Sequence, residues 1–127
     1  MEWENSRWIR TYLKIHIEHI IIFFFLLTEV IDFCAYEVLS IACPTQEVIV
    51  VTSASFGRME QGRCIRENEF IGCENDVLFL ADRWCSGRNR CDVELAVEEL
   101  EAANDNCRSY LKMYTSVEYT CLKGKLT

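Results

Sequence analysis

Eight cysteines constrain the fold of this 127-residue chain more than any other feature. They are even in number, and all lie after position 33, in a stretch of about 95 residues whose hydrophobic core alone would be modest. An even number of cysteines in so short a segment indicates a disulfide framework formed in an oxidising compartment, although spacing alone does not choose the pairs. The cysteines are Cys34, Cys43, Cys64, Cys73, Cys85, Cys91, Cys107 and Cys121.

Metal binding is the competing use of these cysteines. The chain contains no C-x-x-C pair, and its cysteine spacing matches no zinc knuckle or ribbon. Its histidines, His16 and His19, both lie in the first 33 residues, so the cysteine-rich segment has no imidazole to serve as ligand or general base. We therefore expect no metal, no cofactor and no histidine-dependent catalysis there.

The first 33 residues resemble an export leader. Arg7, Arg10 and Lys14 precede the unbroken apolar run Ile20–Leu27, which is the order found in secretory signals. A helix of that run reaches only about 12 Å, less than half of a bilayer core. We predict a signal peptide or leader over residues 1–33 and a secreted or extracellular location, which includes the ectodomain of a receptor. An uncleaved anchor and a misassigned start are the alternatives.

The stretch Val48–Arg58 is the predicted centre of the fold. Its four β-branched residues, Val48–Val51, favour a buried strand, because a branched Cβ packs well on a pleated sheet. Small and hydroxylated residues follow, and Phe56-Gly57-Arg58 then places an aromatic ring, a flexible glycine and a cation at the end of the strand. We expect a binding surface to begin at that end.

The remaining pattern predicts a small α+β domain of antiparallel strands with one or two helices and long stapled loops. Alternating apolar residues indicate strands, and a capping sequence before a helical apolar face indicates a helix. The expected elements are a strand within Cys34–Cys43, a turn at Pro44–Glu47, a disulfide-pinned loop over Met59–Gly72, a helix over Val77–Trp84 capped from Glu74–Asp76, a strand over Asp92–Val97, a helix-prone acidic stretch over Glu98–Asp105 and a closing strand over Tyr110–Cys121.

Charge excludes two classes of partner. The formal net charge is −7, and the basic residues form no run, which argues against nucleic acid and against an anionic membrane surface. The acidic stretch also contains enough carboxylates to form the catalytic pair that a glycosidase needs. A solvent-exposed helix face is the simpler interpretation of these residues. These carboxylates belong to Glu98, Glu99, Glu101 and Asp105.

Several motifs together resemble the galactose- and rhamnose-binding lectin domain first named from sea urchin egg lectin (SUEL). The resemblance covers Cys34 to Cys121 and implies a lectin domain over residues 34–122 with a short tail at 123–127. It also implies a β-sandwich-like fold, metal-independent and non-catalytic sugar binding, and the disulfides Cys34–Cys64, Cys43–Cys121, Cys73–Cys107 and Cys85–Cys91. The motifs are Cys34-x8-Cys43-Pro44, VIVVTSASFGR, Trp84-Cys85-x5-Cys91, Asp105-Asn106-Cys107 and YTSVEYTC at Tyr114–Cys121.

This sequence departs from the family's sugar-binding pattern. The family uses an acid beside the first cysteine, the tyrosine of Tyr-Gly-Arg, and a lysine loop after Asp-Pro-Cys. Here Ala35 stands beside the first cysteine, with Glu37 as the nearest carboxylate, and Phe56 replaces the tyrosine. Lys112 matches the lysine, although Ser109 replaces the glycine of that loop and the segment is one residue longer.

Two other family positions are retained, and each has a structural alternative. Arg58 either contacts sugar or ties loop carbonyls, and Asp105 either contacts sugar or caps a loop. Phe56 is similarly either a platform or a core residue, and Lys112 either a sugar contact or an exposed strand lysine. The predicted function is a lectin module of weakened or altered specificity, with Glu37, Phe56, Arg58, Asp105 and Lys112 as its ligand-binding residues.

The alternative function is recognition of an extracellular protein or a glycosaminoglycan. Domains that resemble this one occur in adhesion receptors such as latrophilins and in Eva-type axon-guidance receptors. An acidic domain suits a sulfated glycan only if its arginines cluster in space. The arginines concerned are Arg58, Arg63, Arg66, Arg88 and Arg90.

Overall fold

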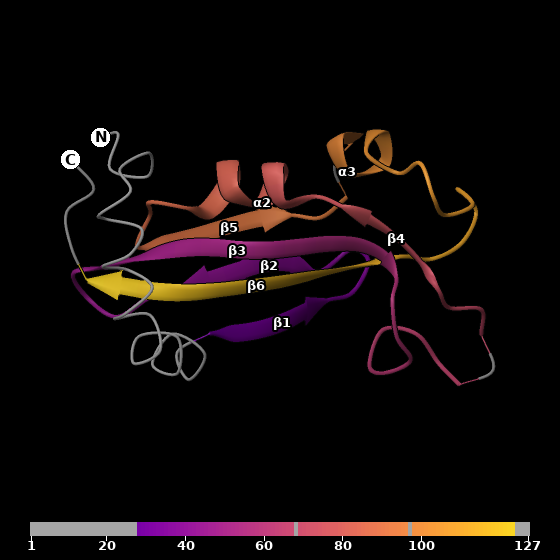
Figure 1. Cartoon of the computed structure of the whole chain (residues 1–127), viewed down its shortest axis with the longest axis horizontal. Coiled ribbons are helices and arrows are strands. Elements are labelled where there is room, and N and C mark those ends of the chain that lie inside the picture. Colours follow the sequence, from indigo (N-terminus) through magenta and orange to yellow (C-terminus); the bar gives the residue numbers. More distant parts are fainter. Residues whose placement is uncertain (1–27, 68, 97, 124–127) are drawn as a thin grey trace, which may run out of the picture.

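The computed structural model describes residues 28–67, 69–96 and 98–123 (Figure 1). These residues form a four-stranded antiparallel sheet of order β1-β6-β3-β4, a two-stranded sheet of β2 and β5, and two short helices. The predicted small α+β, disulfide-stapled fold is confirmed. The elements are β1 (Glu29–Phe33), β2 (Val38–Ala42), β3 (Glu47–Arg58), β4 (Cys73–Asp76), α2 (Leu78–Cys85), β5 (Arg90–Glu94), α3 (Glu98–Ala102) and β6 (Tyr114–Lys123).

Strand β3 is the longest strand of the described chain and lies inside the larger sheet, as its β-branched run predicts. It pairs with β6 over nearly its whole length, and its end also pairs with β4. The register shifts between Val51 and Ser53, which marks a bulge. Ile49 and Val51 are buried before the bulge, and Ala54 and Phe56 are buried after it. The bulge therefore keeps apolar side chains buried along the whole strand.

The hydrophobic core draws on both sheets and α2. Strand β2 alternates exposed and buried residues, so that Leu39 and Ile41 enter the core together. Val117 of β6 and Leu80 of α2 belong to the same cluster. The helix lies alongside β3 in Figure 1, with its buried face toward the core. Each sheet thus covers the apolar side of the other.

All eight cysteines form disulfides, in the pairs that the resemblance implies. The bridge between Cys43 and Cys121 joins residues 78 apart and stabilises the fold by about 4 kcal/mol in the chain-entropy model. The bridge between Cys34 and Cys64 pins the predicted long loop over 59–72. No free thiol remains among the cysteines to coordinate a metal.

Strand β1 was not expected from the sequence, which assigned residues 29–33 to the leader. The structure pairs Glu29–Phe33 with β6, and the Tyr119 hydroxyl donates a 2.9 Å hydrogen bond to the Glu29 carboxylate. Burial and this hydrogen bond raise the pKa of Tyr119 to about 12. The basic residues and the apolar run of the predicted leader lie outside the described residues. Within the described part of the chain, no helix is long and apolar enough to cross a bilayer.

Three predicted elements are shorter than expected, each for a local reason. The strand predicted over Cys34–Cys43 begins only at Val38, because Cys34–Glu37 forms a turn closed by a hydrogen bond from Glu37 N to Cys34 O. Helix α3 ends at Ala102 instead of continuing to Asp105. Beyond that end, the Asn104 side chain hydrogen-bonds the backbone N–H and carbonyl of Cys107 and so stabilises a loop in place of further helix. The closing strand starts at Tyr114 instead of Tyr110, because residues 108–113 form a loop. The predicted strand over Asp92–Val97 is observed earlier, at Arg90–Glu94.

The backbones of β3 and β4 approach each other closely at Gly57, and a substitution there tests this packing. A Cβ at this position would lie 2.4 Å from the Cys73 carbonyl oxygen, in contact with backbone that cannot swing away. We expect Gly57→Ala to lower the free energy of unfolding by about 2 kcal/mol, as overpacking does, in urea denaturation. Gly62→Ala is the matched control, because a Cβ there meets no atom within 4 Å. Equal stability of the two variants would contradict this packing.

Candidate functional site

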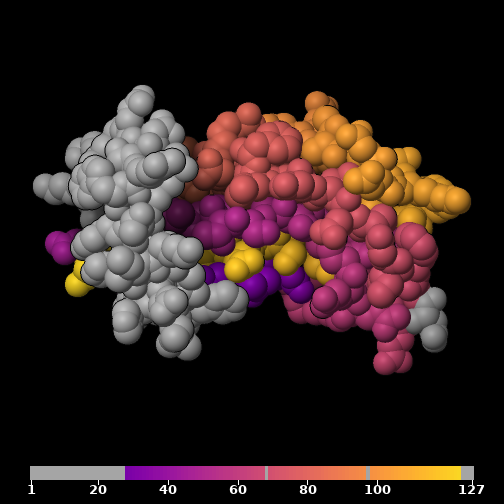
Figure 2. Space-filling view, viewed as in Figure 1, coloured from indigo at the N-terminus to yellow at the C-terminus, as the bar shows by residue number. Residues whose placement is uncertain are grey.

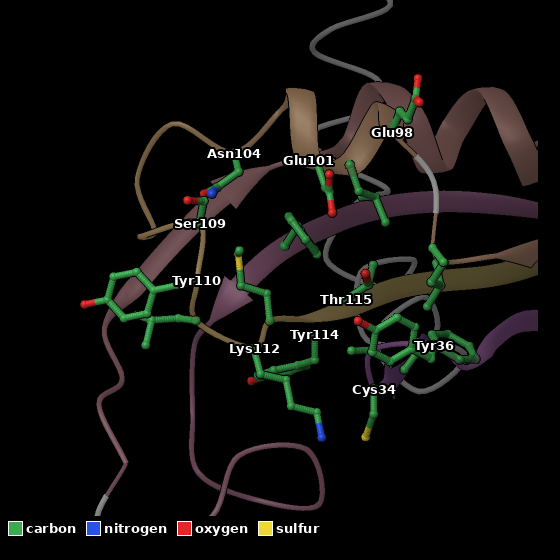
Figure 3. Close-up of a pocket in the computed structure, with 18 residues that line it drawn as sticks. Cys34, Tyr36, Glu98, Glu101, Asn104, Ser109, Tyr110, Lys112, Tyr114 and Thr115 are labelled. Atoms are coloured by element: carbon green, nitrogen blue, oxygen red, sulfur yellow. The ribbon is translucent and has the colours of Figure 1, made fainter.

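A cleft of about 620 Å³ opens where four segments meet (Figure 3). The turn after β1, the end of β3, helix α3 and the loop before β6 each contribute to its lining. Its volume lies within the roughly 300–1,000 Å³ typical of small-molecule sites. Residues that line the cleft include Ala35, Tyr36, Phe56, Glu101, Tyr110 and Lys112.

The pairing of β3 with β6 builds the inner wall of the cleft. Phe56 lies opposite Thr115 in the ladder, and both side chains are almost completely buried. Phe56 therefore belongs to the hydrophobic core and also lines the cleft. Of the two roles considered for Phe56, the structure contains the core role, and its contact with a sugar stays a prediction.

Charged groups reach the cleft from two other elements. Lys112 lies in the loop before β6, and its side chain is exposed. Glu101 extends from α3 into the cleft in Figure 3, whereas the Glu98 carboxylate points away. No sequence signal distinguished Glu101 from the other carboxylates of this acidic stretch. The neighbouring Leu100 is buried, so this end of α3 packs against the core beside the cleft.

The comparison with known families identifies the domain. The family model for the D-galactoside/L-rhamnose binding SUEL lectin domain matches residues 41–121. This chain belongs to the SUEL lectin domain family. No curated protein matches the chain. Binding of D-galactosides and L-rhamnose is the property by which this family is described, so the cleft of this SUEL domain is a candidate sugar site.

Arg58 has a structural position in the SUEL domain. Its side chain is buried, with the residue only 3% exposed, and is absent from the described lining of the cleft. Its guanidinium donates to the Phe70 carbonyl at 2.7 Å, to the Lys112 carbonyl, and to the Glu69 carboxylate at 3.2 Å. Figure 2 shows the rose loop 59–72 and the orange loop before β6 at the same end of the molecule. Arg58 joins these loops and thereby fixes the backbone that carries Lys112.

Asp105 is absent from the described lining of the cleft. It lies in a loop that is held by the side-chain amide of Asn75, a contact that was not predicted from the sequence. The buried side chain of Asn75 accepts hydrogen bonds from the backbone of Asp105 at 2.8 Å and of Asn106 at 3.0 Å. It also donates to the Asn104 side chain, which bonds both backbone groups of Cys107. Asn75 therefore performs the loop-capping that the sequence suggested for Asp105. No sequence signal distinguished Asn75 from an ordinary helix-capping residue.

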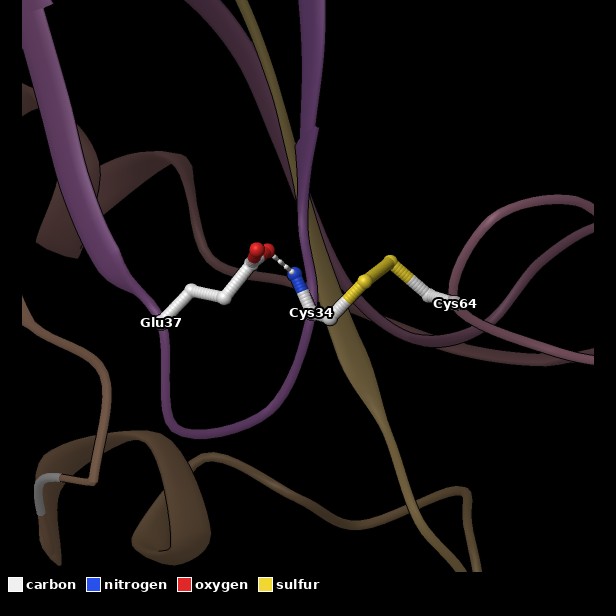
Figure 4. A group of neighbouring side chains, drawn as sticks. All are labelled: Cys34, Glu37 and Cys64. Atoms are coloured by element: carbon white, nitrogen blue, oxygen red, sulfur yellow. Dashed lines mark hydrogen bonds between the residues drawn. A yellow bond between two sulfur atoms is a disulfide. The ribbon is translucent and has the colours of Figure 1, made fainter.

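Glu37 is also absent from the described lining of the cleft. It forms a group of hydrogen bonds beside the disulfide of Cys34 and Cys64, called the Glu37 tie below (Figure 4). Its carboxylate accepts from the Cys34 backbone N–H at 2.5 Å and from the Arg63 guanidinium at 2.9 Å. These bonds lower the pKa of Glu37 to about 2. Cys34, Glu37 and Cys64 are close enough to hold a metal ion, but the two sulfurs are joined in a disulfide. The group is therefore a structural tie of the turn.

The five arginines considered for a sulfated glycan do not form one cluster. Arg58 is buried, and Arg63 and Arg66 lie in the loop after the end of β3. Arg88 lies beside the start of the same strand, where its carbonyl accepts from Ile49 N, and Arg90 pairs with Asp92. Because the two exposed pairs lie near opposite ends of β3, the condition for a sulfated-glycan site is not met.

The tie at Glu37 predicts a pH dependence. Because the folded pKa lies below the ordinary value of 4.5, the stabilisation by Glu37 is complete above pH 4.5 and is lost as the pH falls toward 2. We expect an NMR titration of this carboxyl to have its midpoint near pH 2. Acid unfolding of Glu37→Gln should lack this part of the pH dependence. Glu67→Gln, which removes an exposed carboxylate of the pinned loop, is the control, and a Glu37 midpoint above 4 would contradict the tie.

Proposed function

We propose that this SUEL domain binds a galactose- or rhamnose-type glycan in the cleft, without a metal and without catalysis. One observation carries the proposal: Phe56 and Lys112, which occupy two of the family's ligand positions, come from distant segments and line the same cleft. Ala35, at the family's acid position, lines it as well. These three positions support the proposal that the family's sugar site is this cleft, with altered chemistry.

The charged groups of the cleft suit sugar hydroxyls. A sugar presents neighbouring hydroxyls, each of which both donates and accepts hydrogen bonds. The ammonium of Lys112 supplies donors, and the carboxylate of Glu101 supplies acceptors from the opposite side of the cleft (Figure 3). Hydrogen bonds to charged groups are stronger than those between neutral groups, so this pair can orient a sugar ring. Glu101 thus provides a carboxylate that Ala35 does not.

The specificity of the site differs from the family pattern. Phe56 has no hydroxyl, and Ala35 has no carboxylate, so two hydrogen-bonding groups are missing. Each such group contributes about 1 kcal/mol or more. The carboxylate of Glu101 enters from α3 and not from the turn after β1, so it reaches different hydroxyls. We therefore expect weak or altered monosaccharide binding.

The proposed location is outside the cytosol. Four disulfides in a domain of this size are typical of secreted proteins and ectodomains. The basic residues and the apolar run of the predicted leader, which precede β1 in the sequence, agree with that location. A single weak sugar site also benefits from several copies in an assembly or on a surface, because avidity multiplies a weak contact.

Recognition of an extracellular protein is the second candidate. The losses at Ala35 and Phe56, with every disulfide retained, are what a scaffold adapted to another ligand would show. The sulfated-glycan version of this alternative lacks support, because the arginines lie apart. The two candidate functions, sugar binding and protein recognition, differ in whether the cleft binds free saccharides.

Isothermal titration of the oxidised protein against rhamnose, galactose and a heparin fragment separates these functions. We expect rhamnose or galactose to bind weakly and heparin not to bind. Lys112→Met should reduce the sugar affinity by about tenfold or more, because it removes a charged donor. Lys123→Met, at the far end of β6, is the matched control and should bind as the native protein does.

Two results would contradict the proposal. Absence of heat with all three saccharides would favour a protein partner. Sugar binding that Lys112→Met leaves unchanged would place the site elsewhere on the domain. Circular dichroism of each variant, with its thiol count, shows whether a loss of binding reflects a loss of fold.

A further inference from the structure

Tyr36 has an unusual backbone conformation and an unusual environment. Its φ is 70°, in the left-handed region that bulky residues rarely adopt because it is energetically unfavourable for them. Its side chain is also 86% exposed, so packing in the core does not compensate for this cost. Among the described residues other than glycine, only Gln46 shares a positive φ, in the turn between β2 and β3.

The turn fixes the backbone of Tyr36 at the edge of the cleft. Glu37 N donates to the Cys34 carbonyl at 3.1 Å, and the Cys34 N–H donates back to the Glu37 carboxylate (Figure 4). Cys34 is bonded to Cys64, and Glu37 is paired with Arg63 of the same pinned loop. Because these bonds fix the backbone before any ligand binds, binding has to order only the two side-chain torsions of the tyrosine. A tyrosine therefore offers contact area at a small loss of conformational entropy.

The cleft extends beyond the pair of charged groups. Tyr36 and Tyr110 both line it, and Figure 3 shows them on opposite sides of Lys112. Tyr110 is 75% exposed, and its hydroxyl accepts a 3.1 Å hydrogen bond from Arg108. The cleft volume of about 620 Å³ is in the range of drug-sized ligands, which are larger than one sugar ring. The site therefore has room for a second residue of a glycan.

We propose that the cleft binds a glycan of at least two sugar residues, one held by Lys112 and Glu101 and the next stacked on the ring of Tyr36. This inference rests on the proposed function and adds a second subsite to it. A pyranose ring has an apolar face of C–H groups, and an exposed tyrosine ring offers a flat apolar surface of similar size. Burial of both faces from water supplies affinity that the missing hydrogen-bonding groups at Ala35 and Phe56 do not.

Tyr36 differs from the other exposed aromatic residues in its location or in its backbone conformation. Tyr110 also lines the cleft, but it lacks a positive φ. Phe70 and Phe79 are also exposed, at 61% and 62%, but neither is among the described residues of the cleft lining. Phe79 lies on α2, and Phe70 lies in the loop before β4. Tyr36 combines exposure, a fixed left-handed turn and a position at the cleft. Stacking on a ligand accounts for all three.

The test compares affinities for methyl galactoside and for a set of digalactosides of different linkage, measured by isothermal titration with the oxidised protein. We expect at least one digalactoside to bind roughly tenfold more tightly than methyl galactoside, the effect of burying one apolar ring face. Tyr36→Gly should bring that affinity ratio close to one, because glycine keeps the left-handed turn and removes the ring. Tyr36→Phe should keep the ratio, because it retains the ring.

Gln46→Gly is the matched control. It makes the same backbone change in a turn at the start of β3, whereas the cleft lies at the end of that strand. This variant should keep the native affinity ratio. Phe79→Ala, which removes an exposed ring outside the described cleft, should keep it too.

The outcomes separate the second subsite from the proposed function. If methyl galactoside binds but no digalactoside binds more tightly, the second subsite is wrong and the monosaccharide site stands. The same holds if Tyr36→Gly keeps the native ratio. A ratio lost in both Tyr36→Gly and Tyr36→Phe would mean that the hydroxyl binds the ligand, and would overturn stacking. If neither saccharide binds, the second subsite fails, and the proposed function fails with it when rhamnose also produces no heat.

Discussion

The antiparallel pairing of β3 with β6 is the interaction on which the site depends. It sets Phe56 opposite Thr115 and Gly57 opposite Tyr114, and so brings the end of one strand beside the loop that carries Lys112. The bridge from Cys43 to Cys121 fixes this register from the other end of the two strands. A shift by one residue would turn Phe56 to the opposite face of the sheet, and the cleft would lose its inner wall.

Buried polar side chains hold the backbone around the candidate site. Arg58 donates hydrogen bonds to the two neighbouring loops, and Asn75 bonds the backbone around Asp105. Removal of either side chain would leave buried carbonyl or N–H groups unpaired, which destabilises a small domain. The ligand groups that we propose, Lys112 and Glu101, are exposed instead. In the proposed site, different residues therefore carry the scaffold and the ligand chemistry.

The sequence predicted what depends on local pattern and on cysteine placement. The β-branched run Val48–Val51 identified the central strand, and the family resemblance supplied the disulfide pairs that the structure contains. Of the predicted ligand-binding residues, Phe56 and Lys112 line the candidate cleft, whereas Glu37, Arg58 and Asp105 are absent from its described lining. The roles proposed for Glu101 and Tyr36 could not be predicted from the sequence, because they arise from tertiary placement: α3 and the turn after β1 both border the cleft.

The most direct test of the sugar site is to map it in solution, independently of any variant. Amide chemical shifts of the oxidised, ¹⁵N-labelled protein would be followed by NMR during titration with galactose and with rhamnose. The account predicts saturable shifts for at least one sugar, concentrated at the amides of Glu101, residues 109–113 and the turn at 34–37. Absence of shifts, or shifts concentrated at residues 52–55 on the other described hollow of the surface, would contradict it.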